Sequence, residues 1–321
     1  MHKVIYTQSI GATSAHGPTP KAPPRRERAM VPHASLPRWI KTTIRTGPNY
    51  NRVKALLRQN GLHSVCEEAA CPNIRECWDE GTATFMILGH HCTRGCNFCD
   101  VIKAQPLGYD EDEPRRVANA VAQLKLKQVV ITSVTRDDLP DGGASIFART
   151  IELLRRQDKD VKVEFLIPDL RGNTDSIDIV LHSGVDVFAH NVETVNRLHK
   201  RVRPGMKLDR SLSVLRHAAR SPRRPVVKTG FMVGLGETFD ELVELMHQIY
   251  ATGCDIVTIG QYLRPSLKHL PVERFYRPEE YKELARIGME EIGFGHVEAG
   301  PLVRSSYKAF NQSEKLLEKA C

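Results

Sequence analysis

The sequence lacks several features that would place it in a familiar class of protein. No stretch approaches the roughly 18 consecutive apolar residues of a membrane span. The apolar group near its start, residues 4–6, is much shorter than the roughly 7–15-residue core of a signal peptide. We find no serine-hydrolase elbow, no Walker loop and no His-Glu-x-x-His helix. We therefore expect a soluble cytoplasmic protein that contacts no membrane.

Positive charge is concentrated in the first part of the chain. Of the formal net charge of +8, residues 1–45 carry +7, from eight basic residues against the single acid Glu27. The rest is nearly neutral, so we expect no nucleic-acid partner. The first 48 residues also hold seven of the 19 prolines and show no hydrophobic period, which predicts a disordered basic arm. A mitochondrial transit peptide is the alternative, although clustered prolines disfavour its amphipathic helix.

Beyond the arm, short apolar runs alternate with helical periods. Six βα units in series predict a parallel sheet, either doubly wound or an incomplete barrel. A short amphipathic helix is expected to begin near Asn49 and end at Gly61. Strands are expected over residues 84–88, 128–134, 161–167, 185–189, 226–233 and 255–259, with helices over 114–126, 145–156, 176–182, 211–220 and 238–250. Both architectures put the active site at the carboxyl ends of the strands.

Six of the eight cysteines fall between positions 66 and 99, in two groups of three. The second group, Cys92-x3-Cys96-x2-Cys99, follows the first expected strand, where a barrel carries its chemistry. Zinc sites use four ligands, which only the adjacent histidines at 90 and 91 could complete here. Three thiolates on a 4Fe–4S cluster instead leave one iron open to another ligand, which implies chemistry. A structural zinc knuckle and a plain electron-transfer cluster are the alternatives.

The first group, Cys66-x4-Cys71-x5-Cys77, also offers three thiols and no evident fourth ligand. Cys254 looks like a small buried hydrophobic residue, and Cys321 ends a polar tail.

These spacings resemble those of a known superfamily. The second triad, with aromatic Phe98 before its last cysteine, closely resembles the motif of the radical S-adenosylmethionine (SAM) superfamily. Two triads in this order resemble the lipoyl synthase family in particular, over roughly residues 36–312. Other matching stretches are 61–66, 81–89, 130–138, 141–143, 202–205, 232–237, 260–263 and 300–307.

The resemblance implies an α/β fold: an incomplete (βα)6 TIM-type barrel over residues 81–295. An N-terminal extension at 49–80 would carry the auxiliary ligands, and a C-terminal extension at 296–321 the Arg-Ser-Ser-Tyr motif. It further implies a SAM-cleaving 4Fe–4S cluster on Cys92, Cys96 and Cys99 and an auxiliary, sulfur-donating 4Fe–4S cluster on Cys66, Cys71, Cys77 and Ser306.

Ser305 is the alternative to Ser306, and both serines could equally be turn residues. A serine oxygen binds iron less well than a thiolate, which suits a cluster that must be dismantled.

By the same resemblance, the enzyme inserts two sulfur atoms at C6 and C8 of a protein-bound octanoyl-lysine. The implied partners are carrier domains of 2-oxoacid dehydrogenase E2 subunits and of the glycine cleavage H protein, an electron donor such as ferredoxin or flavodoxin, and an iron–sulfur carrier. Another sulfur-inserting radical SAM enzyme, such as one resembling biotin synthase, and a non-catalytic two-cluster electron carrier are the rival interpretations.

Several residues at expected strand ends are predicted contacts of SAM. They are Phe98, Asp137, Asp138, Asn191, Gly234, Gly236 and Glu237. Each has a plainer interpretation: an aspartate can cap a helix, a Gly-x-Gly can be a tight turn, and a strand-end polar residue can bond its neighbours. Arg201 and Arg203 could hold a carboxylate or lie at the surface.

Overall fold

The structure is a computed structural model that describes residues 36–40, 47–69, 71–79 and 83–320. The predicted disordered arm over residues 1–48 lies mostly outside these ranges, as does Cys321. The described part of the arm includes a short 3-10 turn, Arg38–Ile40, where the Trp39 indole donates a hydrogen bond of 3.1 Å to the backbone oxygen of Tyr276.

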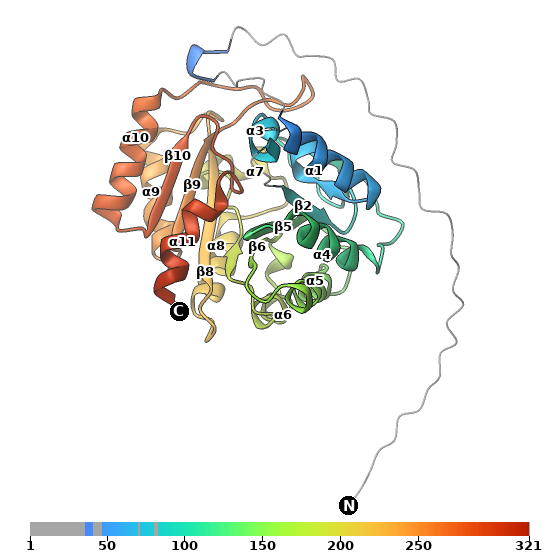
Figure 1. The fold of residues 1–321 in the computed structure, drawn as a ribbon. Helices are drawn as coiled ribbons and strands as arrows, with labels where there is room; N and C mark the ends of the chain where they lie inside the picture. The colour runs from blue at the N-terminus through green and yellow to red at the C-terminus, as the bar shows by residue number, and fades with distance from the viewer. Residues whose placement is uncertain (1–35, 41–46, 70, 80–82, 321) are drawn as a thin grey trace, which may run out of the picture.

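An eight-stranded sheet forms the centre of the molecule, in the order β1-β2-β5-β6-β7-β8-β9-β10 (Figure 1). Only β1 pairs antiparallel with its neighbour, and every other pair in this sheet is parallel. The strands are β1 (His63–Ser64), β2 (Thr84–Ile87), β5 (Gln128–Ser133), β6 (Lys162–Leu166), β7 (Val187–Ala189), β8 (Val226–Val233), β9 (Ile256–Gln261) and β10 (His296–Gly300). Because β1 and β10 are edges, the barrel is incomplete, which confirms the predicted fold class. The parallel strand β10 was not predicted.

Helices α4, α5, α6 and α8 pack beside one another in chain order along the outer side of the sheet, and the remaining helices lie around them (Figure 1). They are α1 (Pro48–Gln59), α2 (Val65–Glu68), α3 (Ile74–Asp79), α4 (Glu113–Leu124), α5 (Ala144–Gln157), α6 (Thr174–His182), α7 (His199–Val202), α8 (Leu208–Ala219), α9 (Phe239–Tyr250), α10 (Pro278–Arg286) and α11 (Ala309–Ala320). Helix α10 runs directly into a π-helical turn, Ile287–Ile292. No helix of the described segments is long and apolar enough to cross a membrane.

Local sequence explains where several of these elements lie. The predicted capping box forms at the start of α9, where the Thr238 hydroxyl and the Glu241 carboxylate each accept from the other residue's backbone N–H. Every residue of strand β8 except Met232 is buried, as expected for a parallel strand covered on both faces. Helix α1 buries Val53, Leu56 and Leu57, the three residues that predicted it.

Helix α11 covers the end of the barrel where the strands begin. Its Leu316 and Leu317 pack against Val187, Val226 and Ile256, the first residues of β7, β8 and β9. Helix α11 therefore covers the amino ends of β7, β8 and β9, whereas the carboxyl end of the barrel carries the loop with Cys92, Cys96 and Cys99.

Candidate functional site

Cys92 ends the short strand β3 (His91–Cys92), and Cys96 and Cys99 lie on the loop that joins β3 to its paired strand β4 (Ile102–Lys103). Backbone bonds hold this loop against the carboxyl end of the barrel, from the Thr93 N–H to the Thr135 oxygen at 3.0 Å and from the Asn97 N–H to the Val202 oxygen at 3.0 Å. The three thiols are thus brought together where β5 and β7 end, as the sequence predicted.

The electrostatics of this triad favour bound positive charge. Burial raises the pKa of Cys96 to about 11 and that of Cys99 to about 12, and the other thiols of the triad add to both shifts. The positive charge of the Arg203 guanidinium opposes this rise in pKa at Cys96. The thiols of Cys96 and Cys99 are therefore costly to ionise without a cation, and metal binding supplies that charge while releasing their protons.

Arg94, inside the cysteine loop, fastens the loop to the sheet. Its guanidinium donates to both oxygens of Asp137, at 2.6 and 2.8 Å, and pairs with Asp169 at 2.7 Å. Asp138 pairs with the buried Arg136 at 2.7 Å. The predicted SAM contacts Asp137 and Asp138 therefore both have arginine partners, and their predicted role in SAM binding stays a prediction.

The polar residues after β7 differ in how many of their hydrogen-bonding groups already have partners in the protein. His190 is fully engaged, with one ring nitrogen 2.9 Å from the Ile167 oxygen and the other 3.0 Å from the Ser211 hydroxyl. Asn191 bonds the side chains of Glu193 and Ser305. Asn191 therefore lies between the triad of Cys92, Cys96 and Cys99 and the C-terminal Arg-Ser-Ser-Tyr motif.

Glu193 was missed by the sequence analysis. It has a left-handed backbone (φ 69°), and its charge acts on Cys96 and Cys99. Burial raises the pKa of Glu193, and Arg203 opposes this. The alternation Asn191-Val192-Glu193 just past a strand was the available signal.

In the glycine-containing loop after β8, backbone N–H groups find their hydrogen-bond acceptor within the loop. The Glu237 carboxylate accepts from the backbone N–H of Gly234 at 2.6 Å and of Leu235 at 2.9 Å. A β-carbon at Gly234 would lie 2.0 Å from the Gln261 amide nitrogen, so the glycine permits close packing. Phe98 packs partly against the core. The SAM contacts predicted for Phe98, Gly234, Gly236 and Glu237 stay predictions.

The other triad lies on the N-terminal extension. Cys66 is on α2, whose N-cap Ser64 accepts from the Cys66 N–H at 3.2 Å, and Cys77 is on α3. The Cys71 N–H donates to the Cys66 backbone oxygen at 3.0 Å. Burial, together with the charge of Cys66, raises the pKa of the Cys71 thiol, which the Asn73 N–H partly offsets by donating to it.

Residues from the far end of the chain complete this site. One pocket is lined by Cys66, Cys71, Asn73, Cys77, Thr84, Arg304, Ser306 and Tyr307. The Asn73 amide donates to the Leu302 oxygen at 2.6 Å, and the Tyr307 hydroxyl donates to Glu76 at 3.1 Å, so α3 and the Arg304–Tyr307 segment are tied together. Ser306 faces the pocket, whereas the Ser305 hydroxyl bonds the Asn191 amide, at 3.0 Å to Nδ2.

The donor sets fit iron–sulfur clusters better than single ions. In a 4Fe–4S cluster each cysteine binds a different iron, so its thiolates stand farther apart than the ligands of one ion. In the described ranges no three His, Cys, Asp or Glu side chains are arranged to hold one metal ion. Near Cys96, the buried Nε atom of Arg203 has no hydrogen-bond partner among the described residues.

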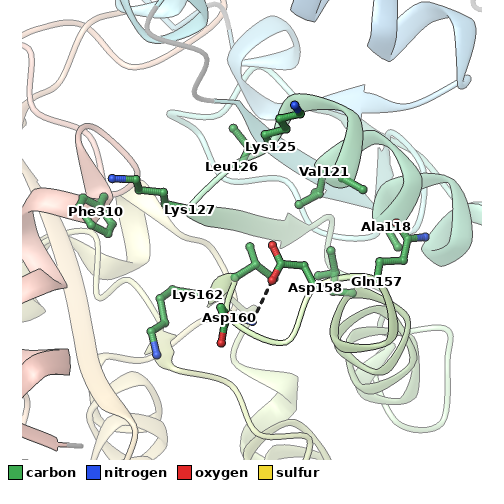
Figure 2. A pocket seen from close by; sticks show the side chains of 13 residues that line it. Ala118, Val121, Lys125, Leu126, Lys127, Gln157, Asp158, Asp160, Lys162 and Phe310 are labelled. Carbon is green, nitrogen blue, oxygen red and sulfur yellow. Dashed lines mark hydrogen bonds between the residues drawn. The ribbon is translucent and has the colours of Figure 1, made fainter.

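Two further features lie away from these sites. Cys254 is buried, and its sulfur donates to the Val227 oxygen at 3.4 Å, as expected for a small core residue. A groove of about 540 Å³ lies at the amino ends of β5 and β6, between Lys125, Lys127, Lys162 and Phe310 (Figure 2). It is at the opposite end of these strands from the loop that carries Cys92, Cys96 and Cys99.

Comparison with known proteins shows two family matches along the chain. Residues 86–249 match the model of the radical SAM superfamily, and residues 20–71 match the N-terminal domain of lipoyl synthase. A lipoyl synthase from Rubrobacter xylanophilus is 50% identical over 297 residues, covering 92% of this chain and 91% of that protein. One from Symbiobacterium thermophilum is 52% identical and covers 92% of each.

Solved structures share the fold at low sequence identity. Methylornithine synthase matches with a TM-score of 0.52 at 13% identity, covering 84% of this chain and 92% of that one. The hydrogenase maturase HydG matches with a TM-score of 0.53 at 13% identity, covering 77% of this chain and 56% of that one.

Proposed function

This chain belongs to the lipoyl synthase family of the radical SAM superfamily, and from that membership we propose how its residues insert sulfur at C6 and C8 of a protein-bound octanoyl-lysine. The observation that carries the assignment of the sulfur-donor site is the single pocket that joins three cysteines of the N-terminal extension to Ser306. A three-cysteine set alone would fit several kinds of centre.

The two cysteine sites divide the work. One-electron chemistry on an unactivated C–H bond, and the inserted sulfur, come from SAM and two 4Fe–4S clusters when these are bound. Cys92, Cys96 and Cys99 hold the cluster that binds SAM, and Arg94 keeps their loop on the sheet. Cys66, Cys71, Cys77 and Ser306 hold the auxiliary cluster.

Polar residues after β7 are suited to the charged parts of SAM. The Arg203 guanidinium, beside Cys96 and with Nε unpartnered among the described residues, can hold a carboxylate. Glu193 and Asn191 offer a carboxylate and an amide to amino and hydroxyl groups. Together these residues bind and orient SAM and exclude water around it.

Ser306 supplies a replaceable ligand. Oxygen from serine matches iron less well than thiolate sulfur does, so this corner of the auxiliary site can open while three cysteines retain the rest. Ser305 is the less suitable ligand because its hydroxyl is bonded to Asn191.

The partners and location follow from the family. We place the reaction in the cytoplasm, supported by the bacterial origin of the relatives named above. The carrier domains of 2-oxoacid dehydrogenase E2 subunits and of the glycine cleavage H protein are the proposed substrates. Ferredoxin or flavodoxin is the proposed electron donor, and an iron–sulfur carrier restores the auxiliary cluster.

The test is an anaerobic assay of the reconstituted protein with dithionite, SAM and an octanoyl-lysine peptide. We expect 5′-deoxyadenosine and a peptide that has gained two sulfur atoms. Cys77→Ala should still release 5′-deoxyadenosine but give no lipoyl peptide, whereas the matched variant Cys254→Ala should keep both activities. Release of 5′-deoxyadenosine without sulfur gain by the unmodified protein would indicate another radical SAM reaction. No SAM cleavage at all would indicate an electron carrier.

A further inference from the structure

Two hydrogen bonds join the candidate SAM site to the auxiliary motif. The Asn191 amide donates from Nδ2 to the Ser305 hydroxyl at 3.0 Å, and that hydroxyl lies 3.3 Å from Asn191 Oδ1. Asn191 follows β7, and Ser305 immediately precedes the proposed cluster ligand Ser306. The contact therefore links residues that belong to different sites.

On its other side Asn191 is connected to the triad of Cys92, Cys96 and Cys99. Its backbone oxygen accepts from Arg203 Nη1 at 3.1 Å, and the charge of the same guanidinium opposes the rise in pKa that burial causes at Cys96. A series of interactions thus runs from Cys96 through Arg203 and Asn191 to Ser305. Coupling between sites requires a physical connection of this kind, together with two states that each site can favour.

The Asn191 amide has little room for alternative positions. Gly230 on β8 faces it, and a β-carbon there would lie 3.1 Å from Asn191 Oδ1 and 2.4 Å from the Thr258 hydroxyl. Because the wall behind the amide is tightly packed, its bonds to Ser305 fix the direction of that serine. The orientation of Ser306, the next residue, depends on the same short segment.

We propose that Ser305 is a positioning residue that orients Ser306 toward the auxiliary cluster, and that SAM binding weakens this hold by competing for the Asn191 amide. The proposal rests on the function proposed above. A ligand shifts such an equilibrium only by its different affinity for the two states, and competition for one amide provides that difference. Ser306 is then firmly held in the resting protein and more easily displaced once SAM is present.

The experiment follows iron loss from the full-length holoprotein to a chelator, with and without SAM and without reductant, so that no turnover occurs. Loss that persists in Cys77→Ala comes from the cluster on Cys92, Cys96 and Cys99 and is subtracted. In the unmodified protein we expect SAM to speed iron loss from the auxiliary cluster about fivefold, the equivalent of one hydrogen bond worth ~1 kcal/mol. Ser305→Ala should lose iron at the fast rate with or without SAM.

Two variants test whether the effect belongs to the Ser305 hydroxyl. Ser305→Thr keeps a hydroxyl and should restore the response to SAM. Ser213→Ala, an exposed serine on α8, should behave like the unmodified protein. The proposal is overturned if SAM leaves the unmodified rate unchanged, if Ser305→Ala still responds to SAM, or if Ser305→Thr behaves like Ser305→Ala.

Mössbauer difference spectra without SAM separate this outcome from failure of the proposed function. Ser306→Ala should remove the signal of an oxygen-ligated iron from the auxiliary cluster. If it does not, Ser306 is not the ligand and the proposed site is wrong. If it does, while Ser305→Ala changes nothing, only the positioning role is wrong.

Discussion

Lys228 and Glu164 form an ion pair inside the barrel, and breaking it gives a quantitative test of how the barrel is held together. The Lys228 ammonium lies 2.8 Å from the Glu164 carboxylate, with side chains 1% and 0% exposed. The Gln128 amide donates to the other Glu164 oxygen at 3.3 Å, and the Ser313 hydroxyl of α11 donates to Gln128 at 3.2 Å. The pair therefore joins β5, β6 and β8 to the C-terminal helix.

The magnitude follows from burial and distance. With an effective dielectric constant of about 20, two unit charges 2.8 Å apart attract by about 6 kcal/mol, most of which offsets their desolvation. Removing one partner leaves the other charge buried and unpaired, which costs about 3–5 kcal/mol. We expect Lys228→Met and Glu164→Gln each to lower the free energy of unfolding by that amount. The double variant should lose far less than the sum.

The assay is urea unfolding of each holoprotein under anaerobic conditions, followed by circular dichroism. Burial already raises the pKa of Glu164, against the influence of Lys228. In Lys228→Met that carboxyl folds in its neutral form, so the unfolded state loses its proton first and the variant becomes less stable as pH rises. Losses under about 1 kcal/mol for both single variants, or additive losses in the double variant, would refute this reasoning.

Other predictions concern individual residues. Thr238→Ala removes half of the capping box and should cost about 1 kcal/mol in urea unfolding. Burial and nearby Arg203 lower the pKa of His190 to about 4. Because a histidine in the unfolded chain binds a proton below about pH 6.5, the free energy of unfolding should fall as pH drops from 6.5 toward 4, by about 3 kcal/mol in total. His190→Asn should flatten that dependence. Gly230→Ala places a β-carbon within 2.4 Å of the Thr258 hydroxyl and should lower the free energy of unfolding by about 1–3 kcal/mol. An unchanged free energy of unfolding would show that the residues around Gly230 can move to make room.

The fold was predictable where burial alone decides the structure. Strand β8 agrees with its predicted range, Val226–Val233, because the apolar residues at both ends of this segment favour burial. Strand β10 was missed because His296 and Glu298 interrupt its apolar character, and its strand form depends on pairing with β9, which is set by tertiary contacts. Lys228 lies within the predicted β8 run, but only the structure shows its partner, Glu164.

The candidate site divides in the same way. Cysteine spacing is local, so both triads could be read from the sequence. The choice between Ser305 and Ser306 could not, because it depends on a contact with Asn191, more than a hundred residues away in the chain. Glu193 escaped notice for a related reason: its place beside Cys96 comes from a left-handed turn that a glutamate seldom adopts.

The auxiliary ligands come from opposite ends of the barrel domain: Cys66, Cys71 and Cys77 precede β2, and Ser306 follows β10. During synthesis the three cysteines leave the ribosome long before the serine does, whereas Cys92, Cys96 and Cys99 emerge together in one short loop. Contacts between such distant segments also form late in folding. Because the four proposed ligands span residues 66 to 306, the auxiliary cluster can obtain all of them only after nearly the whole chain has been synthesised and folded, whereas the proposed ligands of the SAM cluster are available early.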